Sequence, residues 1–312
     1  MSSIFIIIAG ILWGIISVFV TSLKSIGFSS MEVVALRVSF SAIILLIYLL
    51  VTDRSKLKIK LKDIPLFCGT GICSIVFFNF CYFQSIEIIG GAAIPALLLY
   101  TAPIFVMFMS LFLFKENITV KKVISLLITI LGMCFLTGVF SGKETITLEG
   151  FLYGLGAGFG YALYSIFGKF LLKKYDSMTI TTYTFVVASV AVIPFSGIIK
   201  DYNLMLNTES LLWSLGLALV CTILPFILYT KGLLKIEAGK ASILATVEPF
   251  VAAIIGVTVF SEGITVEKII GMVLILFAII LLNINIKKAN CLWYRQYSCK
   301  CKENLWRNTQ NK

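Results

Sequence analysis

Two charged side chains lie inside long apolar segments, and they are the residues of this sequence best suited to chemistry. Glu248 stands between Val247 and Pro249 near the middle of one apolar run, and Arg37 lies seven residues into another. A carboxylate at the centre of a bilayer costs about 3 kcal/mol, so Glu248 should face a cavity or a partner. There it could couple protons or bind a substrate amine. A carboxylate satisfied by hydrogen bonds between helices is the structural alternative.

Arg37 and a set of aromatic and amide side chains could complete such a site. Arg37 could bind a substrate carboxylate, neutralise Glu248, or extend its charged end to the membrane surface. Aromatic rings offer an apolar face and one polar group, which suits amino acids and aromatic compounds. The candidates to line the pathway are Trp13, Asn79, Tyr82, Tyr100, Tyr161, Tyr164 and Tyr229. Packing inside the protein is the alternative for each of them.

Prolines inside the apolar runs point to the same region. Pro95, Pro103, Pro225 and Pro249 each remove a backbone donor and free an upstream carbonyl, which a membrane tolerates beside a wet cavity or a neighbouring helix. Pro103 and Pro249 occupy matching places in the two halves of the chain, and such interruptions indicate a binding site. The alternative is that they only shape packing.

The apolar segments themselves indicate a membrane protein. Hydrophobic residues make up 59% of the chain and charged residues 13%, about half the charged share of a soluble domain. The apolar runs have the length of transmembrane helices. We therefore expect an all-α membrane protein with ten transmembrane helices, at residues 3–22, 31–51, 64–86, 91–113, 121–140, 149–171, 178–199, 209–231, 240–260 and 267–286.

The net charge of +11 is distributed as membrane topology requires and does not indicate a nucleic-acid partner. Lysines and arginines concentrate in the loops after even-numbered segments, whereas loops after odd-numbered segments hold only Lys24, Lys143, Lys200 and Lys268. The positive-inside rule then predicts that both termini are cytoplasmic. No cofactor or metal is expected, because the chain has no histidine and its one close cysteine pair, Cys299 and Cys301, lies in the basic tail.

An internal repeat organises the chain. Residues 95–120 resemble residues 241–266, and a shift of 146 pairs Pro103 with Pro249 and Glu116 with Glu262. We read Glu116 and Glu262 as turn or capping residues. Five segments per copy force the two copies into opposite orientations, as in many secondary transporters. The predicted units are a first five-helix repeat at 1–141, a second at 148–288, and a basic cytoplasmic tail at 289–312.

These features together resemble the EamA family of the drug/metabolite transporter superfamily. The resemblance covers about residues 4–286 and rests on the ten segments, the early arginine and the repeated "F-x-E-x-I-T" turn after a mid-segment proline. It implies a multi-pass carrier of the bacterial inner membrane with a central cavity and alternating access. The sequence departs from symmetry at Glu248, whose counterpart is Ala102, so this carboxylate is not a symmetric structural feature.

Several functions are compatible with this sequence. The leading prediction is a secondary transporter that exports amino acids or related small metabolites, with the lipid bilayer, the substrate and protons as candidate partners. A multidrug exporter of the same fold, an uptake carrier and a channel stay open. A membrane-embedded enzyme would need a nucleophile, an acid/base pair or a metal site. The sequence has no histidine, no paired carboxylates within its apolar segments and no nucleotide-binding glycine loop, so an enzyme is not the leading prediction.

Overall fold

The computed structural model describes residues 2–141 and 146–284, and within these ranges every regular element is helical. The expectation of an all-α membrane protein is confirmed. The predicted tail at 289–312, with its cysteine pair, lies outside the described residues. The helices are α1 (Ser2–Gly14), α2 (Ile16–Ile26), α3 (Ser30–Thr52), α4 (Ile64–Cys68), α5 (Phe77–Ile89), α6 (Ala93–Leu99), α7 (Ala102–Phe114), α8 (Val120–Thr137), α9 (Leu148–Leu171), α10 (Ser177–Ser196), α11 (Tyr202–Met205), α12 (Thr208–Ala218), α13 (Leu224–Leu233), α14 (Ala238–Ala245), α15 (Val247–Thr258) and α16 (Val266–Asn283).

Consecutive helices join into membrane-length stretches. Among the described residues, nine stretches of 18 to 29 residues are long and apolar enough to cross a bilayer, each matching an expected segment. The remaining expected segment coincides with α9, a glycine-rich helix of 24 residues outside that group of nine. The count of ten spans therefore stays a prediction.

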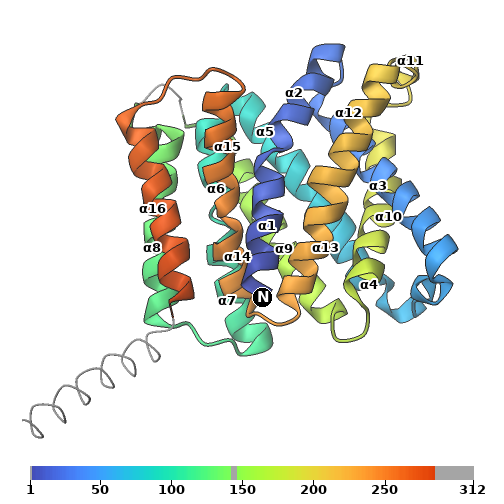
Figure 1. The fold of residues 1–312 in the computed structure, drawn as a ribbon, viewed down its shortest axis with the longest axis horizontal. Coiled ribbons are helices and arrows are strands. Elements are labelled where there is room, and N and C mark those ends of the chain that lie inside the picture. Colours follow the sequence, from blue (N-terminus) through green and yellow to red (C-terminus); the bar gives the residue numbers. More distant parts are fainter. Residues whose placement is uncertain (1, 142–145, 285–312) are drawn as a thin grey trace, which may run out of the picture.

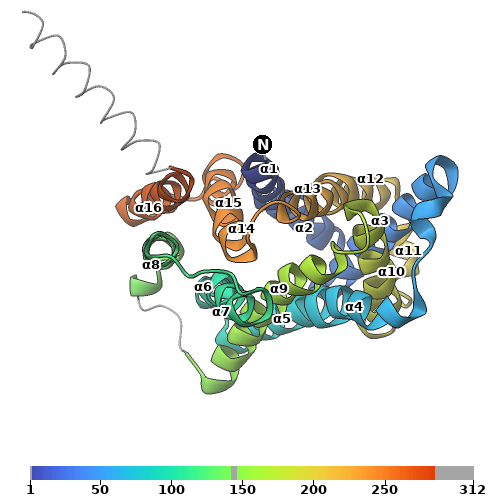
Figure 2. The ribbon, with the colours of Figure 1, turned by 90° about the horizontal axis from the view of Figure 1, so that it is seen from below.

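The helices form two rows that face each other. Figure 2 shows α16, α15, α1, α13 and α12 in one row and α8, α6, α9, α5 and α4 in the other. The pairs α8–α16 and α3–α10 close the two ends of the rows. We call the end of the bundle at which α1 begins the N-terminal face (Figure 1). The last residues of α13 lie there too, because Gly232 packs near the carbonyl of Ser2.

Two of the apolar segments are broken in the middle, and the breaks lie at matching places. The α6–α7 break falls at Tyr100 and Thr101, and the α14–α15 break at Thr246. In each break a threonine hydroxyl donates to the carbonyl three residues earlier at 2.6 Å, Thr101 to Leu98 and Thr246 to Ile243. These hydroxyls satisfy carbonyls near the end of the first helix.

The structure corrects how the prolines act. Pro103 and Pro225 are at the first or second position of α7 and α13, and Pro249 is in the first turn of α15. Backbone donors in a first turn have no partner within the helix, so a proline there costs little. We expected these prolines to remove hydrogen bonds inside a span. Pro103 and Pro249 instead lie in the first turn of a new helix after a break, whereas Pro225 lies inside a continuous helical stretch, two residues after the π-helical turn at Leu219–Ile223.

Glycines let the first helix of each half pack on the break in the other half. A Cβ on Gly10 would lie 2.9 Å from the carbonyl oxygen of Ala245, and one on Gly158 would lie 2.7 Å from that of Leu98. Both distances are shorter than real Cβ contacts, so these positions admit only glycine. Gly10 and Gly158 therefore serve packing.

Candidate functional site: a cavity between the two rows

A cavity of about 450 Å³ lies between the two rows of helices. Residues lining its mouth include Ser30 at the start of α3, Thr137 at the end of α8, and Glu262 and Lys268 around the start of α16. These residues lie at the end opposite the N-terminal face. The cavity therefore opens toward that opposite end, and its volume is within the range of small-molecule sites.

The structure brings the predicted side chains together. All nine line this one cavity, namely Glu248, Arg37, Trp13, Asn79, Tyr82, Tyr100, Tyr161, Tyr164 and Tyr229. They come from seven helices or breaks that are far apart in the sequence. Pro249 also lines the cavity, whereas Pro103 does not. That these residues bind a substrate stays a prediction.

Glu248 projects from the first turn of α15, just after the break at Thr246. The hydroxyl of Tyr161 on α9 donates to its Oε2 at 3.2 Å. The positive end of the α15 dipole favours a negative charge at this position. The break therefore places the carboxylate at the cavity wall in a setting that partly offsets its loss of hydration.

Arg37 is buried on α3, with 7% of its surface exposed, and it lines the same cavity. Its Nε has no hydrogen-bond partner among the described residues, and none of their ion pairs includes Arg37. Of the three roles expected for Arg37, extension to the surface does not fit this burial, and a direct ion pair with Glu248 is not formed. Binding of an anionic group in the cavity stays a prediction for Arg37.

Aromatic side chains form one wall of the cavity, deep between α1, α9 and α13. Trp13 packs against Phe226 and Tyr229 with ring centroids 5.2 and 5.4 Å apart. The Tyr164 hydroxyl shares a hydrogen bond of 2.8 Å with Thr230, and Ser165 shares one of 2.6 Å with Tyr229. We call Trp13, Tyr164, Ser165, Phe226 and Tyr229 the aromatic floor. Because its tyrosine hydroxyls are paired within the protein, the floor presents mainly apolar surface.

Two findings differ in detail from the sequence analysis. The Asn79 amide donates one N–H to the carbonyl of Ile75, four residues earlier, at 2.7 Å, so its second N–H and its carbonyl oxygen are left for the cavity. Ser165 and Phe226 line the cavity but were not identified from the sequence. The sequence signal that could have identified Phe226 is its position directly after Pro225. In the structure, this segment also contains a wide π-helical turn at Leu219–Ile223.

A helical membrane bundle with a mainly apolar cavity that carries a few charged and polar side chains is typical of small-molecule membrane transporters. A model of the EamA-like transporter family matches residues 1–138 and again residues 148–284, so the chain belongs to this family. It is a multi-pass protein of the lipid bilayer.

Relatives agree with this assignment. An "Uncharacterized transporter" of Archaeoglobus fulgidus is 28% identical over 88% of this chain and 94% of its own length. A "Probable amino-acid metabolite efflux pump" of Salmonella typhimurium is 24% identical over 68% of this chain and 74% of its own length. A crystal structure with 16% identity shares the fold, with a TM-score of 0.77 over 90% of this chain and 96% of that chain.

Proposed function

We propose that this protein exports amino acids or closely related zwitterionic metabolites by alternating access. The observation that carries the proposal is the presence of two opposite charges in one cavity. Glu248 offers a carboxylate, and Arg37 offers a buried guanidinium with an unpartnered Nε. An α-amino acid carries the complementary pair, an ammonium group and a carboxylate. Arginine suits the carboxylate because its planar fork donates two parallel hydrogen bonds.

The rest of the cavity supports a small substrate with an apolar side chain. A volume of about 450 Å³ is sufficient for a single amino acid. The aromatic floor would contact the substrate side chain, and Tyr82 and Tyr100 stand on the wall formed by α5 and the α6–α7 break. Glu248, withdrawn from bulk water, is also the proposed proton-coupling group.

The proposed orientation follows the basic loops. The N-terminal face would lie in the cytoplasm of a bacterial cell, together with both termini, and the cavity would face outside. The two halves, 1–141 and 148–288, would be inverted copies of each other. Two separate family matches and the matching breaks at Thr101 and Thr246 support this arrangement.

Counterflow in liposomes tests the proposal. Purified protein is reconstituted with unlabelled amino acid inside, and uptake of trace labelled amino acid is measured. We expect saturable uptake for at least one amino acid, and a loss of affinity of about thirtyfold or more in Arg37→Gln and Glu248→Gln. Arg54→Gln, at an exposed loop arginine, is the control and should behave as the wild type.

Two results would refute the proposal. The first is an absence of counterflow with every amino acid in the wild type. The second is unchanged counterflow in both cavity variants. Saturable counterflow of cationic dyes alone would favour the multidrug alternative, for which the aromatic floor is the supporting feature.

A further inference from the structure

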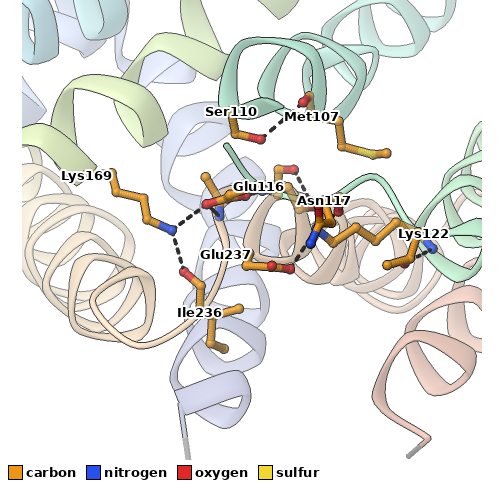
Figure 3. Close-up of polar contacts among 12 residues, drawn as sticks. Met107, Ser110, Glu116, Asn117, Lys122, Lys169, Ile236 and Glu237 are labelled. Atoms are coloured by element: carbon orange, nitrogen blue, oxygen red, sulfur yellow. Dashed lines mark hydrogen bonds and ion pairs between the residues drawn. The ribbon is translucent and has the colours of Figure 1, made fainter. Parts of the chain in front are cut away.

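A polar cluster lies at the N-terminal face, at the α7–α8 turn and the start of α14 (Figure 1), and its contacts are drawn in Figure 3. At its centre is Glu116, in the turn between α7 and α8, with 7% of its side chain exposed. Its Oε1 accepts from Lys169 Nζ at 2.6 Å and from the Ala238 N–H at 2.8 Å, and its Oε2 accepts from the Gly239 N–H at 3.2 Å. A buried carboxylate with three donors is well satisfied.

Neighbouring contacts extend the cluster on both sides. Lys169 also donates to the carbonyl of Ile236 at 3.0 Å. Lys122 pairs with Glu237 at 2.7 Å and donates to the carbonyl of Asn117 at 2.7 Å. The cluster thus joins the α7–α8 turn of the first half to α9 and the start of α14 in the second half. These are elements from both sides of the cavity.

The cluster is mechanically connected to the cavity through two helices. On α9, Lys169 is four residues, or one helical turn, beyond Ser165 of the aromatic floor. On the other side, α14 runs from the cluster to the break at Thr246, two residues before Glu248. A movement of the cavity wall at either place would displace a partner of Glu116.

The matching glutamate at the other end has a different environment. Glu262 occurs in the same sequence turn as Glu116 and also contacts a lysine, Lys268, at 2.8 Å. Lys268 belongs to the following helix of the same half, and 53% of the Glu262 side chain is exposed at the cavity mouth. One end of the bundle is therefore tied across the two halves through its glutamate, and the open end is not.

We propose that Glu116, with Lys169 and the start of α14, is the lock that closes the cytoplasmic end of the transport pathway, and that these bonds break when the cavity opens inward. The inference rests on the proposed carrier function, and it assigns Glu116 a gating role that the sequence repeat alone does not reveal. Burial alone would raise the pKa of Glu116, but Lys169 and the two backbone N–H groups outweigh it and lower the pKa below its usual value. The lock is therefore charged at neutral pH.

The distance across the lock tests this inference directly. Spin labels are attached at Asn117→Cys and Lys235→Cys, two exposed positions on either side of the cluster, after the native cysteines are replaced. Pulsed electron paramagnetic resonance then measures the distribution of distances between the two spin labels in liposomes. The labelled protein without further changes should give one narrow distribution, as expected for a closed end.

The expected result is a second, longer distance when the lock is broken. Glu116→Gln and Lys169→Gln should each increase the population of the long distance about tenfold or more, because each removes one charge of a buried pair. Glu262→Gln is the matched control, since it removes the same charge from the same motif at the exposed end, and it should leave the distribution unchanged. If Glu116→Gln does not fold, Lys169→Gln decides the question alone.

Two outcomes would overturn the lock. One is an unchanged distance distribution in the folded lock variants. The other is an equal opening in Glu262→Gln, which would show that loss of any charge loosens the bundle. Counterflow by the wild type tests the carrier function separately and does not involve the lock variants. A lock that fails while counterflow persists therefore refutes only this inference. Absent counterflow refutes the proposed function, and with it the gating role that rests on it, whatever the label distances show.

Discussion

The contact between α8 and α16 should be sensitive to a single methyl group. A Cβ on Gly271 would lie 2.6 Å from the carbonyl oxygen of Gly132 and 2.6 Å from the backbone nitrogen of Leu136. Both atoms belong to the backbone, so no flexible side chain can move aside. An ordinary contact begins at 3.4 Å, and the helices would have to separate locally by the difference between 3.4 and 2.6 Å.

We expect Gly271→Ala to destabilise the protein by about 1 to 3 kcal/mol, the usual cost of overpacking a tight interface. For a chain of this size, that cost corresponds to a fall in melting temperature of roughly 2 to 12 °C. The measurement is thermal unfolding of the purified protein in detergent, monitored by tryptophan fluorescence or by a dye that becomes fluorescent when it reacts with cysteine thiols.

Gly263→Ala is the control for this prediction. A Cβ on Gly263 meets no atom within 4 Å, and its backbone is not in the left-handed region. Such a surface change should stay within about 0.5 kcal/mol of the wild type. Equal melting temperatures for Gly271→Ala and Gly263→Ala would refute the reasoning, because they would show that the two helices do not approach as closely as the structure has them.

Three further predictions concern side chains. The pKa of Glu116 is lowered in the folded protein, so its charged form stabilises the closed end above the ordinary carboxylate range. This stabilisation is lost only as the pH falls through the lowered pKa. The label distance across the lock should therefore not change from about pH 8 to about pH 5. Asp176→Ala removes the N-cap of α10 and should cost about 1 kcal/mol in thermal unfolding, whereas an unchanged melting temperature would contradict the capping role. Tyr161→Phe removes the hydroxyl that donates to Glu248 and should weaken counterflow affinity about tenfold, with Tyr153→Phe as the control on the same helix.

The sequence was sufficient to predict the helices and the main charges of the candidate site. Apolar run length gave the positions of the spans, since a bilayer sets the length of a helix that crosses it. The cost of a charge in that setting singled out Glu248 and Arg37, and both line the cavity. Such costs depend only on residue type and on local sequence, so they can be read without a structure.

Other features depend on packing between distant segments, which the local sequence does not specify. Lys169 has an ordinary place at the end of a helix, and nothing in its neighbours indicates that it binds Glu116. The repeat makes Glu116 and Glu262 look equivalent, yet one is buried and the other exposed. The two glutamates differ in burial because the bundle is closed at one end and open at the other, and the shared motif carries no information about which end is closed.

The way Gly10 and Gly158 pack has a consequence for how the protein is made. Each half supplies the helix that covers the broken segment of the other half, with Gly10 against Ala245 and Gly158 against Leu98. During synthesis, the α6–α7 break would enter the membrane before α9 exists to cover it. The first half should therefore form an incomplete folding intermediate, in which the α6–α7 break is not yet packed against α9, until the second half has been synthesised and inserted.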